Sequence, residues 1–174
     1  MRGGVIEECS GDLSPHIQTL LKKLELQFLN INKGMKDKER KLMTSLQNCN
    51  SFKNILKESK DIYSRFDAYD NKGNIYELKC RDEYYDDVVI EFDKFSYNFL
   101  YCVELTKKSF FYVVQMPEVG GVVFDITQLH SLGHDFKWQR MKMPMTTEFG
   151  TDKTISKIEG FIAVKKQSDT VKLE

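Results

Sequence analysis

The sequence has no apolar run near the roughly 20 residues that a membrane-spanning helix needs, and its first residues contain no apolar signal segment. It also has only three prolines and no proline- or glycine-rich linker. None of its cysteines forms a Cys-x-x-Cys pair, so neither a zinc site nor a disulfide framework is expected. These absences predict one domain over residues 1–174, cytoplasmic, with reduced thiols and no membrane partner. The cysteines are Cys9, Cys49, Cys80 and Cys102.

Net charge is also lacking, because 26 basic residues balance 26 acidic ones. The overall charge therefore gives no support for nucleic-acid binding. Its distribution is uneven, however. Basic residues exceed acidic ones in residues 1–60 and 136–174, and acidic residues dominate 61–100. Such an arrangement allows two basic flanks to hold phosphates on either side of an acidic centre.

The most informative segment runs from Phe66 to Cys80. Asp70-Asn71-Lys72-Gly73 separates two short β-like runs, and asparagine and glycine favour the dihedral angles of a tight turn. The segment therefore predicts a β-hairpin with Asp67 on its first strand. Glu77 and Lys79 would share one face of the second strand, because strand side chains alternate.

Two carboxylates and one amine then meet in a small volume. Mg²⁺ prefers hard oxygen ligands and keeps several waters, so one or two carboxylates suffice to hold it. A bound metal supplies a nucleophile and relieves charge on a phosphodiester, and a nearby lysine adds to that relief. We therefore interpret Asp67, Glu77 and Lys79 as candidate catalytic residues of phosphodiester hydrolysis.

Other readings of the pattern remain open at this point. A surface ion pair between Glu77 and Lys79 explains the spacing as well as a metal site does. The same spacing recurs from Asp125 to Asp135-Phe136-Lys137, although a helix-like run at 127–132 replaces the tight turn. His130 and His134 are predicted to be structural or exposed, because Gly133 weakens the helix that would bring them together.

The hairpin resembles the active site of the PD-(D/E)xK nuclease superfamily, and within it the PvuII-like type II restriction endonucleases. The resemblance covers about fifteen residues. It rests on Asp67-Ala68, Asp70-Asn71, Gly73 and Tyr76-Glu77-Leu78-Lys79. It implies an α/β fold with a restriction-endonuclease-like core, in which helices flank a mixed β-sheet and an N-terminal helical region is added.

The resemblance also implies a chemistry. Asp67 and Glu77 resemble metal-binding carboxylates, the carbonyl of Leu78 an additional metal ligand, and Lys79 the catalytic lysine. The implied cofactor is Mg²⁺, with Mn²⁺ as a substitute, and the implied partners are double-stranded DNA and a second copy of the chain. Two features depart from the family: Phe66 stands where many members have proline, and no histidine-rich stretch follows Lys79.

The rest of the chain divides by periodicity. Residues 1–60 are predicted to be mainly helical and to form the dimerisation region that the resemblance implies. A helix is expected from Ser14 to Gly34, a second from about Lys36 and a third around Phe52–Leu56. Residues 61–164 form the predicted catalytic core. It has a helix from Asp86 to Leu100, strands at 109–115, 122–126 and 158–164, and a short helix after Thr127. Residues 165–174 are expected to be a loose tail.

Residues 136–150 have a different character, in which basic residues alternate with large apolar ones. Arg140 is our candidate base reader because its planar fork can engage guanine. Lys137, Lys142, Thr146 and Thr147 are candidate phosphate contacts. The alternative is an edge strand whose basic side chains are simply solvated.

Together the patterns predict a Mg²⁺-dependent endonuclease that cuts double-stranded DNA as a type II restriction-type homodimer. Three alternatives stay open: a junction-resolving or repair nuclease, an RNA-directed nuclease of the same fold, and a DNA-binding module without catalysis.

Overall fold

Strand β3 (Ile75–Cys80) carries the central residues of the predicted site and lies inside a six-stranded sheet. The computed structural model describes residues 37–49, 55–59, 65–144, 154–167 and 169–171. The sheet has the order β1-β2-β3-β5-β6-β9. Its other strands are β1 (Leu56–Glu58), β2 (Ala68–Asp70), β5 (Phe110–Met116), β6 (Gly120–Asp125) and β9 (Asp169–Val171).

The sheet is mixed. β1, β2 and β3 form an antiparallel meander, β3 and β5 are parallel, and β6 is antiparallel to both β5 and β9. A parallel pair requires a crossover connection. Here the crossover contains β4 (Asp87–Glu91), α3 (Phe92–Leu100) and the π-helical turn η1 (Tyr101–Thr106). The crossover therefore places a helix over the face of the sheet that carries Glu77.

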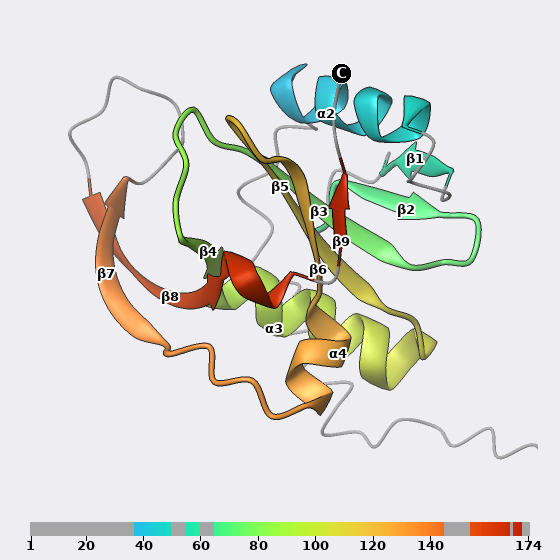
Figure 1. The fold of residues 1–174 in the computed structure, drawn as a ribbon. Coiled ribbons are helices and arrows are strands. Elements are labelled where there is room, and N and C mark those ends of the chain that lie inside the picture. Colours follow the sequence, from blue (N-terminus) through green and yellow to red (C-terminus); the bar gives the residue numbers. More distant parts are fainter. Residues whose placement is uncertain (1–36, 50–54, 60–64, 145–153, 168, 172–174) are drawn as a thin grey trace, which may run out of the picture. The chain divides into compact units, whose positions relative to one another are not determined.

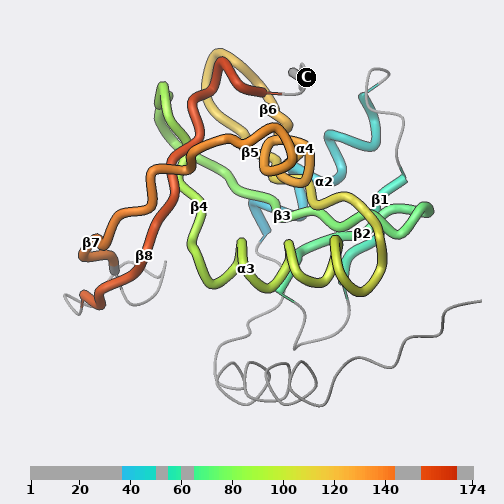
Figure 2. The backbone as a smooth tube through the Cα atoms, turned by 90° about the horizontal axis from the view of Figure 1, so that it is seen from below, coloured from blue at the N-terminus to red at the C-terminus, as the bar shows by residue number. Residues whose placement is uncertain are grey.

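Two apolar clusters cover the two faces of this sheet. On one face, Leu42 and Leu46 of α2 (Asp37–Asn48) pack against residues such as Tyr76 and Leu78. The other face packs against α3, α4 (Ile126–Ser131) and residues of a second sheet. Figures 1 and 2 show α2 and α3 on opposite faces of the six-stranded sheet. The fold is therefore mixed α/β, with helices flanking a mixed sheet.

The second sheet is antiparallel and has the order β4-β8-β7, with β7 (Gln139–Pro144) at one edge and β8 (Thr154–Ala163) in the middle. Its core-facing residues include Val88, Ile90 and Ile162. Trp138 packs over Gly160, where an added Cβ would lie 2.6 Å from a ring carbon of the tryptophan. This sheet brings one face of β8 towards β3 and α3.

Several expected elements are confirmed. The helix from about Lys36 is α2, the hairpin is β2–β3, and β5 and β6 match the two expected apolar strands. β8 contains most of the expected final strand and begins earlier, at Thr154. α4 occurs as expected, but its N-cap is Asp125. Thr127 lies inside the helix and accepts a hydrogen bond from Phe110 N.

Other expectations were wrong. The third helix expected at Phe52–Leu56 is replaced in its described part by β1, whose Leu56 is buried against the sheet. The helix expected from Asp86 begins only at Phe92, because Val88 and Ile90 alternate into the core as part of β4. The expected loose tail contains the 3₁₀ turn η2 (Val164–Lys166) and β9, which pairs with β6.

The chain divides into two units, Met1–Asn32 and Lys33–Glu174, and all of the described residues belong to the second. The single domain expected from the sequence stays a prediction. The helix expected at Ser14–Gly34 lies outside the described residues, as does most of the predicted dimerisation region. Among the described residues, no helix is long and apolar enough to span a membrane.

Candidate functional site

The β2–β3 turn is built around the carboxylate of Asp70, which is 2 % exposed. Its Oδ1 accepts hydrogen bonds from Lys72 N at 2.8 Å and Asn74 N at 2.9 Å. Its Oδ2 accepts from Asn74 Nδ2 at 2.9 Å and Tyr76 Oη at 3.0 Å. Gly73 has a φ of 81°, as the turn chemistry predicted. Asp70 is thus fully engaged in shaping the hairpin and not available to a ligand.

The hairpin fixes Asp67 beside β3, one residue before β2 begins. The backbone N of Asp67 donates to Tyr76 O at 3.0 Å, and its side-chain Oδ2 accepts from Leu78 N at 2.7 Å. Tyr76 and Leu78 are the two neighbours of Glu77 along β3. Asp67 is therefore anchored on both sides of Glu77, and the two carboxylates that the sequence predicted to converge do so.

Glu77 is only 3 % exposed, and it faces the α3 side of the sheet. Its Oε1 forms an ion pair with Nζ of Lys94, a residue in the first turn of α3. Its Oε2 is buried and has no hydrogen-bond partner among the described residues. A buried carboxylate oxygen without a partner is costly, so Glu77 is suited to accept a further cation or donor.

The protonation states of Asp67, Glu77 and Lys94 depend on one another. Burial, and then the negative charge of Glu77, raise the pKa of Asp67 to about 8 from its ordinary value of 3.8. Burial acts to lower the pKa of Lys94, but the charges of Glu77 and Asp67 outweigh it and raise that pKa. Two carboxylates that cannot both ionise cheaply are relieved by a bound cation.

Lys79 lies two residues after Glu77 on the same face of β3 and is partly buried. Among the described residues, no hydrogen bond or ion pair engages its ammonium group. Leu78 points its side chain into the opposite cluster, so only its backbone is near the site. Its N–H holds Asp67, and the metal-ligand role of its carbonyl stays a prediction.

Sequence reasoning missed five charged residues that belong to the same region. Arg81 follows Lys79 on the same face, because its N–H continues the ladder by donating to Gln115 O at 2.9 Å. Strand alternation alone could have identified it. The others, Glu91, Lys94, Lys157 and Glu159, come from β4, α3 and β8, and no local pattern connects them to the hairpin.

Glu91 and Glu159 are paired directly across β4 and β8. Nζ of Lys157 lies 3.1 Å from Oε2 of Glu91, and this contact compensates one of the two charges. Glu159 is 0 % exposed, and neither of its carboxylate oxygens has a hydrogen-bond partner among the described residues. Burial, and then the charge of Glu91, raise the pKa of Glu159 to about 7, whereas the charges of Lys157, Lys79 and Arg81 act to lower it.

In the second copy of the motif, Asp125 and Asp135 both accept hydrogen bonds from backbone N–H groups two or three residues further along the chain. Oδ1 of Asp125 caps α4 by accepting from Gln128 N at 2.9 Å. Oδ1 of Asp135 accepts from Lys137 N at 2.9 Å. His130 packs against Phe99, with ring centroids 4.3 Å apart, in keeping with a structural role.

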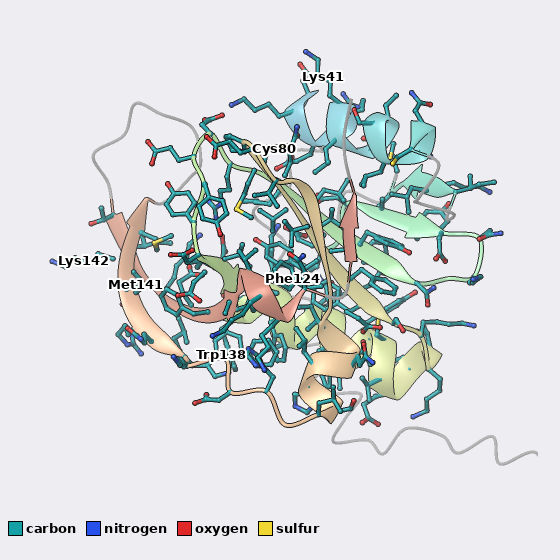
Figure 3. All side chains as sticks on the ribbon, in the orientation of Figure 1. Lys41, Cys80, Phe124, Trp138, Met141 and Lys142 are labelled. Carbon is teal, nitrogen blue, oxygen red and sulfur yellow. The ribbon has the colours of Figure 1, made fainter. Side chains whose placement is uncertain are left out.

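The predicted DNA-contacting residues lie at the edge of the second sheet. Lys137 is exposed in the loop before β7, and Arg140 and Lys142 are exposed on β7 itself. Thr146 and Thr147 fall outside the described residues. Arg140 pairs with Ile158 and Met141 with Lys157, so alternation sets Arg140 and Lys142 on the face opposite to Lys157 and Glu159. Figure 3 shows Lys142 and Met141 leaving β7 on opposite sides.

The donor set decides which metal can fit. The described residues contain no group of three or more histidine, cysteine, aspartate or glutamate side chains placed to hold a metal. Asp67 and Glu77 supply two carboxylates, one with an unpartnered buried oxygen. This set fits a hard divalent cation that keeps its waters and gains further ligands from a substrate phosphate. It does not fit a closed structural zinc site.

Comparisons with family models, curated proteins and solved structures found no match for this chain.

Proposed function

We propose that the chain is a metal-dependent nuclease that hydrolyses phosphodiester bonds in double-stranded DNA. The observation that supports this most is the placement of Asp67 and Glu77. Asp67 is held by the two backbone neighbours of Glu77, and Glu77 keeps one buried oxygen without a partner. Lys79 lies on the same face of the same strand. The turn itself is satisfied by Asp70, so its geometry does not require Glu77 or Lys79.

In this proposal each residue of the site has a separate role. Asp67 and Glu77 would hold a divalent cation, for which Asp67 gives up its proton and Lys94 leaves Glu77. When bound, Mg²⁺ supplies an activated water and relief of phosphate charge. Lys79 places its ammonium beside the same phosphate and neutralises its non-bridging oxygens. The partly buried setting strengthens each of these interactions relative to water.

The test is incubation of supercoiled plasmid with the purified protein in Mg²⁺, Mn²⁺ or EDTA. We expect cutting with the metals and none in EDTA. Discrete fragments indicate a restriction-type enzyme, and a smear indicates a nonspecific nuclease. Glu77→Gln and Lys79→Ala should both be inactive while folded, and the control Asp135→Asn should stay active. A wild-type protein that leaves plasmid, branched DNA and RNA intact in every metal would contradict the proposal.

The restriction-type, homodimeric and cytoplasmic assignments belong to the same proposal and rest on the resemblance. The free thiols of Cys80 and Cys102 agree with a reducing compartment. Light scattering with and without a DNA duplex measures the number of copies. Branched DNA and RNA in the same cleavage assay distinguish a restriction-type enzyme from the junction-resolving and RNA-directed alternatives.

One observation favours a second candidate, a DNA-binding module without catalysis. The Lys94–Glu77 ion pair already compensates the carboxylate that the metal would use. In such a module Lys94 would be a permanent partner of Glu77, and Mn²⁺ would not displace it. Binding of Mn²⁺ measured by its electron paramagnetic resonance signal separates the two candidates: the nuclease binds the ion, and Glu77→Gln loses that binding.

A further inference from the structure

Not every charged residue around Glu77 has a partner of opposite charge among the described residues. Lys94 is paired with Glu77, and Lys157 is paired with Glu91. Lys79 and Arg81 remain, and among the described residues neither head group has a hydrogen bond or an ion pair. The buried carboxylate of Glu159 also remains without a hydrogen-bond partner among the described residues. Lys79 and Arg81 are therefore the two cations of this group that no contact compensates.

Lys79 and Arg81 are positioned as a pair. Lys79 lies in β3 and Arg81 directly follows the strand, so the two residues are two positions apart on the same face of the sheet, about 6.6 Å along the strand direction. Arg81 lies at the end where the strand ladder closes with the bond to Gln115 O at 2.9 Å. Both residues are partly buried, which makes their charges more effective than those of solvated side chains.

The chemistry of the two head groups selects a phosphate. A guanidinium presents a planar fork that binds two phosphate oxygens, and an ammonium adds a point charge. We propose that Arg81 and Lys79 form a phosphate-binding subsite that holds a phosphate of the DNA backbone in the absence of a metal ion. The choice of DNA rests on the proposed function.

Glu159 has a defined place in this subsite. Its buried carboxylate has no donor among the described residues, and the charges of Lys79 and Arg81 both act on it. It is the anion that competes with phosphate for these two cations. Other carboxylates lie nearby in the loop after Arg81. Asp82 is paired with Lys38 at 2.8 Å, and Glu83 and Asp86 accept from tyrosine hydroxyls.

The subsite predicts opposite effects from two substitutions. Arg81→Gln removes an attractive charge and should weaken DNA binding about tenfold, with a salt slope reduced by about one. Glu159→Gln removes the competing anion and should tighten binding severalfold. Arg81→Lys keeps the charge without the fork, so it should retain the slope and lose part of the affinity.

The experiment measures fluorescence anisotropy of a labelled DNA duplex in EDTA at several salt concentrations. Lys72→Gln is the matched control, because Lys72 is exposed in the turn at the other end of β3 and should behave like the wild type. Thermal unfolding shows which variants are folded. If Arg81→Gln does not fold, Arg81→Lys and Glu159→Gln still test the subsite. Equal affinity and slope for the wild type and the Arg81 and Glu159 variants would overturn the subsite. So would an equal loss in Lys72→Gln.

The subsite and the proposed function can fail separately. A protein that cuts plasmid in Mg²⁺ but binds no duplex in EDTA retains the function and lacks the subsite. A protein that loses duplex binding on Arg81→Gln yet cuts nothing in any metal has the subsite and lacks the nuclease activity.

Discussion

Lys94, in the first turn of α3, donates to the buried carboxylate of Glu77 in the middle of β3, so a residue 17 positions away occupies the predicted metal ligand. The contact crosses from helix to sheet, and it compensates a charge that would otherwise be buried alone. It therefore stabilises the fold and opposes metal binding at the same time. The Lys94–Glu77 ion pair thus favours the stability of the metal-free protein at the expense of metal binding.

The first prediction follows from that competition. Lys94→Met should destabilise the metal-free protein by about 3–5 kcal/mol, because Glu77 is left as an uncompensated buried charge. The same variant should bind Mn²⁺ more tightly, since no ammonium has to leave. Urea unfolding in EDTA and Mn²⁺ titration measure the two effects. Lys38→Met, which breaks the exposed pair with Asp82, is the control and should change neither. Weaker Mn²⁺ binding in folded Lys94→Met would mean that Lys94 supports the ion and does not exclude it.

The second prediction concerns pH and Asp67. The pKa of Asp67 is about 8 in the folded protein against 3.8 for the unperturbed group. The folded state thus holds the proton more tightly than the unfolded state between these values. The contribution of this group to the free energy of unfolding is fully present below about pH 4 and is lost as pH rises towards 8.

Asp67→Asn removes this titration and keeps an oxygen that can accept from Leu78 N. We expect the variant to be inactive and, in EDTA at pH 9, to unfold at a higher temperature than the wild type. At pH 4 the two should be similar. Asp135→Asn, with its exposed carboxylate, is the control and should follow the wild type. A lower unfolding temperature for Asp67→Asn at pH 9 would show that the ionised carboxylate of Asp67 stabilises the hairpin, and that its burial does not reduce the stability of the protein.

The third prediction separates the structural role of Asp70 in the hairpin from the proposed catalytic role of its neighbours. Asp70→Ala removes the acceptor of four hydrogen bonds, all of them buried or partly buried. We expect a loss of about 2–4 kcal/mol in the free energy of unfolding. Cleavage should fall only in proportion to the unfolded fraction. Activity assayed well below the unfolding temperature measures this, and complete inactivity of folded Asp70→Ala would give Asp70 a role at the phosphate.

The candidate site shows which parts of a fold a sequence can predict. The hairpin with Asp67, Glu77 and Lys79 was predictable because the turn residues and the two-residue alternation are local. The first half of the expected helix from Asp86 was wrong because its apolar spacing fits both a helix and a strand followed by a helix. The strand forms because these residues pair with β8, in which Glu159, the partner of Glu91, lies 68 positions later (159 − 91). The contributions of Lys94 and Glu159 were not predictable, since both depend on contacts between elements that are distant in the chain.

The fourth prediction concerns the basic edge strand. Arg140 and Lys142 lie on the face of the second sheet opposite to Lys157 and Glu159, so a duplex that contacts them and Arg81 must pass over the edge strand β7. If it does, Lys142→Ala should weaken binding to every sequence and reduce the salt slope by roughly one. Arg140→Ala should instead relax preference at one base pair, at a cost of about 1–3 kcal/mol.

Both variants should fold normally, because both side chains are exposed. Anisotropy with the preferred duplex and with single-base variants of it, at several salt concentrations, separates the two effects. Adding Arg81→Gln to Lys142→Ala extends the test. If one duplex contacts both residues, the losses in binding free energy should add within about 0.5 kcal/mol, as for independent sites. Unchanged affinity and slope in both single variants would place DNA on the β3 side alone, with the edge of β7 turned to solvent.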